Sequence, residues 1–213
     1  MRAHPFVNGE FYHIFNRGVD KRKIFLEKTD FERFLRGIEV FNARDPIGSI
    51  HEYSFRTKLG NRVAKSRLVN VVCYCLNPNH YHIVLEQVVD GGISTYMHRL
   101  STGFTQYFNH KYKRSGVLFQ GKFKSVPIVS NNQLLHVSAY VNLNDRVHGL
   151  HPNISISSWN EYRNDIRGGL CKKDIIIKQF KNISEYISFA GDSLVDVRAR
   201  KEELKELTGL LME

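Results

Sequence analysis

The feature that most constrains the fold is a pair of strand-like segments separated by a tight turn. Residues 70–76 and 80–85 are dense in β-branched and aromatic side chains, and Asn77-Pro78-Asn79 lies between them. Val, Ile and aromatic residues favour strands, whereas Asn and Pro favour turns. We therefore predict a β-hairpin with a three-residue loop, which implies an antiparallel sheet in this part of the chain.

The segments around the hairpin alternate between extended and helical patterns. Thr29 is the expected N-cap of a helix over residues 30–41, in which apolar residues recur every three or four positions. Two more helices are expected over residues 94–113 and 130–143. The order β-α-β-β-β-α-β-α favours an α+β fold, with an antiparallel sheet and helices on one face. The other expected strands are residues 11–15, 49–55 and 117–128.

The composition changes after His151, and on this basis we predict two parts. Residues 1–150 would form the main domain, and residues 151–213 would be a C-terminal extension packed on it. Residues 154–164 are rich in serine and include the only tryptophan. A mixed-charge helix is expected over residues 195–211, with its leucines in register at Leu204, Leu207 and Leu211.

The charge of the chain indicates a polyanionic partner. There are 31 Lys and Arg residues against 21 Asp and Glu residues, which gives a net charge of +10. Neither residues 53–85 nor residues 91–144 contain an acidic side chain. A basic face can simply be solvated, but two long acid-free tracts favour contact with nucleic acid.

Several other classes of protein are disfavoured. Three cysteines are too few for a disulfide scaffold. No apolar run approaches the roughly 20 residues that a membrane helix needs, and the first residues lack the apolar stretch of a signal peptide. Phosphate-binding loops, dinucleotide fingerprints and nucleophile elbows are also missing from the sequence. We expect an intracellular protein, without a membrane partner, in a reducing compartment.

Two histidines form the first candidate site. His80 and His82 are separated by one residue in a predicted strand, so both imidazoles project from the same face. Two ring nitrogens at this spacing can bind one divalent cation. Most His-X-His triplets have no such role, and the spacing alone leaves both interpretations open. Cys73 and Cys75 also share a face, but without a second cysteine pair buried packing is the better interpretation.

A second candidate site lies on the helix predicted over residues 130–143. Tyr140 and Asn144 are four residues apart, so the phenol and the carboxamide lie on one stripe, with His136 one turn earlier. Helical tyrosines are usually core residues, and that alternative stays open here. A separate core-facing stripe is nevertheless available from Leu135, Ala139 and Leu143.

Five segments together resemble the IS200-like HUH (Y1) transposases, and most closely the REP-associated tyrosine transposases. The similarity extends over about residues 5–165. Two departures from the family pattern occur, Tyr81 between the histidines and Asp145 after the helix asparagine; neither removes a reacting group. The similar segments are residues 12–18, 77–82, 116–125, 140–144 and 157–162.

The resemblance implies a ferredoxin-like HUH endonuclease fold and a specific reaction. In that family a tyrosine attacks a phosphodiester of single-stranded DNA, forms a 5′-phosphotyrosine and frees a 3′-hydroxyl. Tyr140 would be this nucleophile. A divalent cation, Mg²⁺ or Mn²⁺, would be held by His80, His82 and Asn144 and would polarise the scissile phosphate.

The resemblance also implies a partner: single-stranded DNA with hairpin elements, bound in the prokaryotic cytoplasm at the nucleoid by a monomer or a homodimer. The basic tracts would contact phosphates, Phe119 and Phe123 would stack on bases, and the turn after residue 15 would read the bases beside the hairpin. The expected DNA-binding residues are Asn16, Arg17, Lys21, Arg22, Lys23, Lys111, Lys113, Arg114, Phe119, Gln120, Lys122, Phe123 and Lys124.

Two alternatives accompany this hypothesis. The chain would be a non-catalytic hairpin-binding protein if the scaffold were kept without its chemistry, although the four reacting groups are all present. A rolling-circle replication initiator or relaxase shares the histidine pair and the tyrosine, but such proteins usually carry further domains.

Overall fold

The computed structural model describes residues 5–53, 66–151, 153–164, 166 and 168–210, and only the backbone over 201–210. Its centre is a five-stranded sheet in the order β4-β1-β3-β2-β5, and every strand pair in it is antiparallel. The expected α+β class and antiparallel sheet are confirmed. The strands are β1 (Phe11–Arg17), β2 (Val69–Asn77), β3 (His80–Gln87), β4 (Lys124–Ile128) and β5 (Ile156–Ser157).

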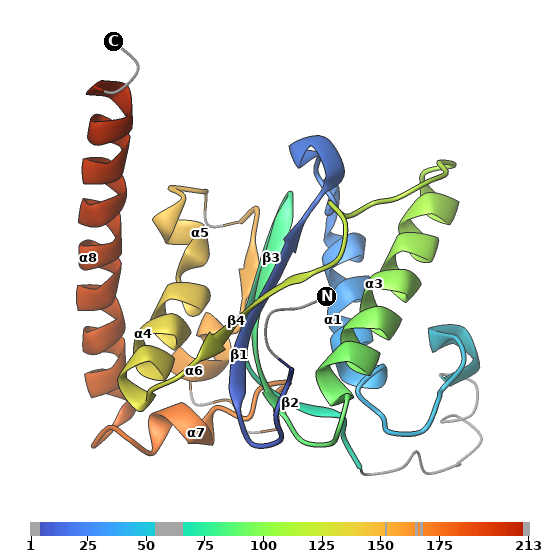
Figure 1. Cartoon of the computed structure of the whole chain (residues 1–213), viewed down its shortest axis with the longest axis horizontal. Helices are drawn as coiled ribbons and strands as arrows, with labels where there is room; N and C mark the ends of the chain where they lie inside the picture. The colour runs from blue at the N-terminus through green and yellow to red at the C-terminus, as the bar shows by residue number, and fades with distance from the viewer. Residues whose placement is uncertain (1–4, 54–65, 152, 165, 167, 211–213) are drawn as a thin grey trace.

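Helices cover both faces of the sheet (Figure 1). On one face lie α1 (Lys28–Val40) and α3 (Gly92–Lys111), and on the other lie α4 (Asn131–Asn142) and α8 (Ile183–Leu210). Helices were expected on one face only. Helices α1 and α3 do share a face, but α4 and α8 lie on the opposite one. Within the described ranges, no helix combines the length and the apolar character that crossing a bilayer requires. The shorter helical elements are η1 (Val19–Lys21), α5 (Asn144–Val147), α6 (Trp159–Arg163) and α7 (Asp174–Ile177).

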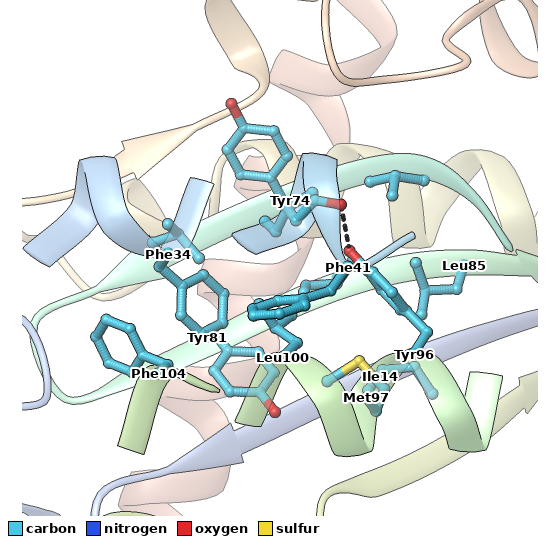
Figure 2. Packing of buried hydrophobic residues seen from close by; sticks show 14 of the residues in the cluster. Ile14, Phe34, Phe41, Tyr74, Tyr81, Leu85, Tyr96, Met97, Leu100 and Phe104 are labelled. Atoms are coloured by element: carbon cyan, nitrogen blue, oxygen red, sulfur yellow. Dashed lines mark hydrogen bonds between the residues drawn. The ribbon is translucent and has the colours of Figure 1, made fainter. Parts of the chain in front are cut away.

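The strands separate two apolar cores because side chains alternate across a strand. Ile14, Tyr81 and Ile83 face α1 and α3, and the rings of Tyr81 and Phe34 lie 5.2 Å apart there (Figure 2). Val84 faces the opposite way and belongs to the core under α4 and α8. A strand that is buried on both sides has few polar positions, which explains the continuous apolar run of β2.

The predicted hairpin forms, but its loop is shorter than expected. Asn77 pairs with His80 in the β2–β3 ladder, so only Pro78 and Asn79 make the turn. The Pro78 carbonyl accepts hydrogen bonds from the backbone of Ile24 and Phe25. These long-range bonds stabilise the tight turn, and the predicted three-residue loop is wrong by one residue.

The strand predicted over residues 49–55 is wrong. Residues 50–53 are helical, and residues 54 and 55 lie outside the described part of the chain. The Ser49 hydroxyl accepts from the backbone of Glu52, and the Glu52 carboxylate accepts from the backbone of Ser49. This reciprocal capping box starts a helix, and the Ser-x-x-Glu spacing that encodes it is visible in the sequence.

The C-terminal segment shares a core with the sheet. Tyr162, Ile176 and Tyr186 are fully buried in the cluster that also holds Val84. The Tyr186 hydroxyl accepts a hydrogen bond of 3.0 Å from Asn142 at the end of α4. Helix α8 thus packs on α4 and shares its core, while the leucine register over residues 204–211 lies outside the described side chains.

A buried carboxylate ties α1 to α3. Asp30 has no exposed side-chain surface and accepts hydrogen bonds from the Tyr107 and Tyr112 hydroxyls and from Lys111, whose Nζ is 2.8 Å from Oδ1. It also accepts from the backbone of Leu26 and Glu27, so Glu27 rather than Thr29 is the N-cap of α1. Burial alone would raise the Asp30 pKa, but these hydrogen bonds outweigh it and the pKa lies below its ordinary value.

We predict that Asp30→Asn lowers the free energy of unfolding by about 1.5–3 kcal/mol at pH 7, since a hydrogen-bonded charge is replaced by a neutral amide. Because the folded-state pKa is depressed, the stabilisation is present above the unfolded pKa of about 3.9 and is lost as the pH falls through the folded value. Urea unfolding from pH 7 to pH 3 measures this, with the exposed Asp192→Asn as control. An undiminished difference at pH 3 contradicts it.

Candidate active site

Three imidazoles lie on the sheet face that α4 covers. His80 and His82 both point to this face, as the predicted alternation requires, and their ring centroids are 5.2 Å apart with the planes perpendicular. His13 of β1 pairs with Val84 and is therefore a diagonal neighbour of His82. Its Nε2 lies 2.8 Å from Nδ1 of His82. The sheet thus brings together two predicted residues and one that sequence reasoning missed.

Helix α4 places Tyr140 over these rings. Its ring meets His82 at 5.8 Å and His13 at 6.0 Å between centroids, nearly perpendicular in both cases. Of the predicted core stripe, Ala139 and Leu143 are buried, whereas Leu135 is half-buried and its neighbour Leu134 is buried instead. Tyr140 is half-buried and faces the histidines. His136 points elsewhere, because it bonds Ser193 of α8. The predicted convergence of Tyr140 with the histidine pair is therefore present.

Asn144 completes the cluster from the first residue of α5. The helix breaks at Leu143, so Tyr140 and Asn144 belong to two helices rather than to one. Asn144 is fully buried, and its Oδ1 lies 3.4 Å from Nε2 of His80. Asn77 donates to the same Oδ1 at 2.7 Å. Sequence reasoning also missed Asn77 as a site residue, because it was assigned only to the predicted turn.

The proton of His80 can be placed from its neighbours. Nδ1 of His80 lies 2.6 Å from Oδ1 of Asn79, an atom that only accepts hydrogen bonds. The pKa of His80 is lowered to about 4, first by burial and then by His148 nearby, so the ring is neutral at pH 7. A neutral ring with its proton on Nδ1 has a lone pair on Nε2, which accepts a hydrogen bond of 2.9 Å from Nδ2 of Asn77. Asn144 Oδ1 lies 3.4 Å from the same nitrogen.

The other two imidazoles are neutral as well. Burial lowers the pKa of His13 to about 4. The pKa of His82 lies well below its ordinary value because of burial and of the histidines around it. Burial raises the pKa of the Tyr140 phenol, and the nearby Asn144 amide offsets part of this rise. At pH 7 the cluster is thus uncharged, with imidazoles in the form that binds metal ions.

These residues fit a divalent cation. Adjacent ligands on an octahedral ion with bonds of about 2.1 Å stand about 3 Å apart, close to the 3.4 Å between His80 Nε2 and Asn144 Oδ1. Nε2 of His82 has no hydrogen bond to any described residue, and the buried Nδ2 of Asn144 is also unpartnered within those residues. In the described chain no three His, Cys, Asp or Glu side chains converge on a metal position, so a cation held by His80 and His82 would need a ligand of another kind, such as the Asn144 oxygen.

A cavity of about 1130 Å³ opens from the cluster. His80, His82 and Tyr140 are among its lining residues, and Phe25, Leu26 and Ile154 contribute apolar lining. Its one acidic lining residue, Glu27, is paired with Lys111. The cationic lining residues are Arg17, Lys21, Lys23, Lys28 and Lys124. The space is therefore basic and large enough for nucleotides.

Two of the predicted DNA-binding segments form one unit at the rim. The Gln120 backbone donates to the Arg17 carbonyl at 2.8 Å, and Arg17 Nε donates to the Gln120 side chain. Asn16 is buried and donates to the Gly121 carbonyl at 3.2 Å. The turn after β1 and the segment before β4 are therefore held together beside the histidines.

The other predicted DNA-binding residues divide by exposure. Lys111 is bound by Asp30 and Glu27, and Arg114 by Asn109 and the Val117 carbonyl. Phe119 is buried, packing on Tyr81 and Phe104, so its ring belongs to the core, and Phe123 is half-buried against the same core. The exposed ones are Lys21, Arg22, Lys23, Lys113, Lys122 and Lys124.

Two departures from the resemblance leave the site intact. Tyr81 points into the core under α1 and α3, on the sheet face opposite the histidines. Asp145 follows Asn144 in α5 and is partly buried. His148, at the end of α5, is a further residue missed from the sequence, and its ring lies 5.2 Å from that of His80.

Comparisons with known proteins identify the fold and the family of the chain. A solved structure of a REP-associated tyrosine transposase bound to a REP hairpin matches 76% of this chain and 83% of its own length, with a TM-score of 0.51 and 14% sequence identity. At this identity the likeness establishes the fold. The search of curated proteins gave no match. The family model for IS200-like transposases matches residues 38–144, just over half of the sequence, and the chain therefore belongs to the IS200-like transposase family.

Proposed function

We propose that the protein is a metal-dependent single-strand DNA nickase and strand transferase that cleaves beside DNA hairpins through a 5′-phosphotyrosine. The observation that carries this proposal is the convergence of Tyr140, His80, His82 and Asn144 beside a basic cavity, which the first three line. Membership of the transposase family supports the class of reaction. The hairpin specificity is inferred from the related structure, which holds a REP hairpin.

In the proposed reaction the phenolic oxygen of Tyr140 attacks the phosphorus of a phosphodiester. The new bond joins that oxygen to phosphorus, the bond to the 3′-oxygen breaks, and the phenolic proton passes to solvent while the 3′-oxygen takes one up. Attack by a second 3′-hydroxyl reverses these steps and joins a new strand. Because the bond energy stays in the phosphotyrosine, the transfer needs no nucleotide cofactor.

The residues around Tyr140 would bind the cation and orient the phenol. His80, His82 and Asn144 would hold Mg²⁺ or Mn²⁺, which when bound polarises the scissile phosphate and stabilises charge on the leaving oxygen. Burial raises the pKa of Tyr140, so the phenol stays protonated until substrate is in place. The perpendicular packing against His82 and His13 fixes the direction of the phenol.

The cationic rim would bind the DNA backbone. Arg17, Lys21, Lys23 and Lys124 line the cavity and would meet phosphates of the strand that enters it. Their substrate would be chromosomal DNA in the prokaryotic cytoplasm. Lys111 and Arg114 are excluded from this path by their intramolecular bonds, and we assign them to packing of α3.

We predict that Tyr140→Phe abolishes covalent attachment to a hairpin-bearing single-stranded oligonucleotide, because the attacking oxygen is removed. Hairpin affinity should be unchanged, since the ring and its packing remain. Denaturing gels detect the covalent protein–DNA adduct, and a gel-shift titration measures the hairpin affinity. An adduct in the variant sinks the assignment of the nucleophile, and hairpin binding without any adduct in the natural protein favours the non-catalytic alternative.

We predict that EDTA eliminates the adduct and that added Mn²⁺ restores it in the natural protein but not in His82→Ala. The reason is that a chelator removes the ion, whereas the alanine removes one of its ligands. Hairpin binding should persist in EDTA, because the basic rim does not depend on the ion. Adduct formation at full rate in EDTA would show that the reaction proceeds without a cation.

We predict that Lys124→Gln weakens binding of single-stranded DNA and reduces the slope of log affinity against log salt concentration by about 0.7, as expected for the loss of one phosphate contact. Lys178→Gln is the matched control, because Lys178 is an exposed lysine at the end of α7 that pairs with Asp174. It is not among the residues that line the cavity. Fluorescence anisotropy titrations at salt concentrations from about 50 to about 200 mM measure the affinity and the salt slope of both variants. Equal slopes for the two variants contradict the proposed path.

A further inference from the structure

His13 is the one imidazole of the cluster that the proposed reaction leaves without a task. It touches both a proposed ligand and the proposed nucleophile: Nε2 lies 2.8 Å from Nδ1 of His82, and the ring edge meets Tyr140. It is not a third ligand beside His80 and His82, because no such group of three converges in the described residues. Its hydrogen bond to the proposed metal ligands is therefore the one to His82.

The two proposed histidine ligands have different partners behind them. The Nδ1 of His80 faces Oδ1 of Asn79, which can only accept, so the proton of His80 is held on Nδ1. The Nδ1 of His82 faces an imidazole nitrogen, which can either donate or accept. The tautomer of His82 is thus decided by which way this one hydrogen bond runs.

Only one direction is compatible with a ligand role. If His13 donates, the proton of His82 must sit on Nε2, and that atom has no lone pair for a cation. If His13 accepts, His82 carries its proton on Nδ1 and presents a free Nε2, which has no other partner among the described residues. Ligating histidines usually donate their second N–H to such an acceptor, and the acceptor fixes both tautomer and ring direction.

We propose that His13 is a positioning residue whose Nε2 accepts the Nδ1 proton of His82 and so keeps Nε2 of His82 free for the catalytic cation. This inference rests on the proposed function. The two ring planes lie within 25° of each other with centroids 5.0 Å apart, so the nitrogens meet edge to edge and nearly in the plane of both rings, as an N–H···N bond requires. The Phe15 ring lies beside His82, with centroids 5.7 Å apart and planes at 24°, so the His82 ring has little freedom to rotate.

The first experiment measures Mn²⁺ affinity by isothermal titration calorimetry without DNA. His13→Phe keeps an aromatic ring but removes the acceptor, and it should weaken Mn²⁺ binding about 10–100-fold. His13→Gln places an amide oxygen near the position of Nε2 and should restore most of the affinity. His98→Gln, an exposed change on α3, is the control and should bind as the natural protein does. Natural affinity in His13→Phe overturns the proposal.

The second experiment reads the tautomer of His82 directly, by long-range ¹H–¹⁵N NMR of the metal-free natural protein. The proposal requires the proton on Nδ1, and His13→Phe should move it to Nε2 if the variant folds. A proton on Nε2 in the natural protein overturns the proposal without any variant. If the natural protein binds no Mn²⁺, the metal step of the proposed function fails, whereas the tautomer still decides the role of His13.

Discussion

The antiparallel ladder between β1 and β3 is the constraint on which the site depends. Its register sets Phe15 opposite His82 and His13 opposite Val84, so both histidines share one face of the sheet. Since alternation is fixed by the backbone, a shift of one residue in either strand would turn its imidazoles into the other core. The two apolar cores make such a shift costly, because Tyr81 and Ile83 would then leave the packing under α1 and α3.

The position of the tyrosine depends on a second, polar constraint. At the end of α4, Asn142 accepts a hydrogen bond of 2.6 Å from Ser158 and donates to Tyr186 of α8. Ser158 in turn accepts from the backbone of Tyr74 in β2. Every member is buried, so breaking one bond leaves an unsatisfied polar group in the core. The network fixes α4 against the sheet, and with it the placement of Tyr140 over the histidines.

The sequence allowed prediction of what is periodic and local. The hairpin and the shared face of His80 and His82 follow from spacing within single elements, and both are present; of the core stripe beside Tyr140, Ala139 and Leu143 are buried. Contacts across long sequence separations were not predictable: Asp30 binds Lys111 from 81 residues away, and Phe119 is drawn into the core by Tyr81. His13 was missed for the same reason, because only the pairing of β1 with β3 places it beside His82. The helix at residues 50–53 was a different failure, since its capping box is visible in the sequence and outweighs the strand propensity of its apolar residues.

The chemistry of the cluster explains why the rest of the cavity is basic. None of the three proposed ligands carries a charge at pH 7, so a bound cation would keep its full positive charge and would be held less tightly than by a site with carboxylate ligands. Such a site is strengthened by an anionic oxygen in an open position, which a phosphodiester supplies. A carboxylate ligand would tighten the ion but would also repel the phosphate. In the proposed function, the neutral ligand set would therefore couple cation binding to the arrival of DNA, and the lysines and arginine at the rim would provide the affinity that brings the DNA there.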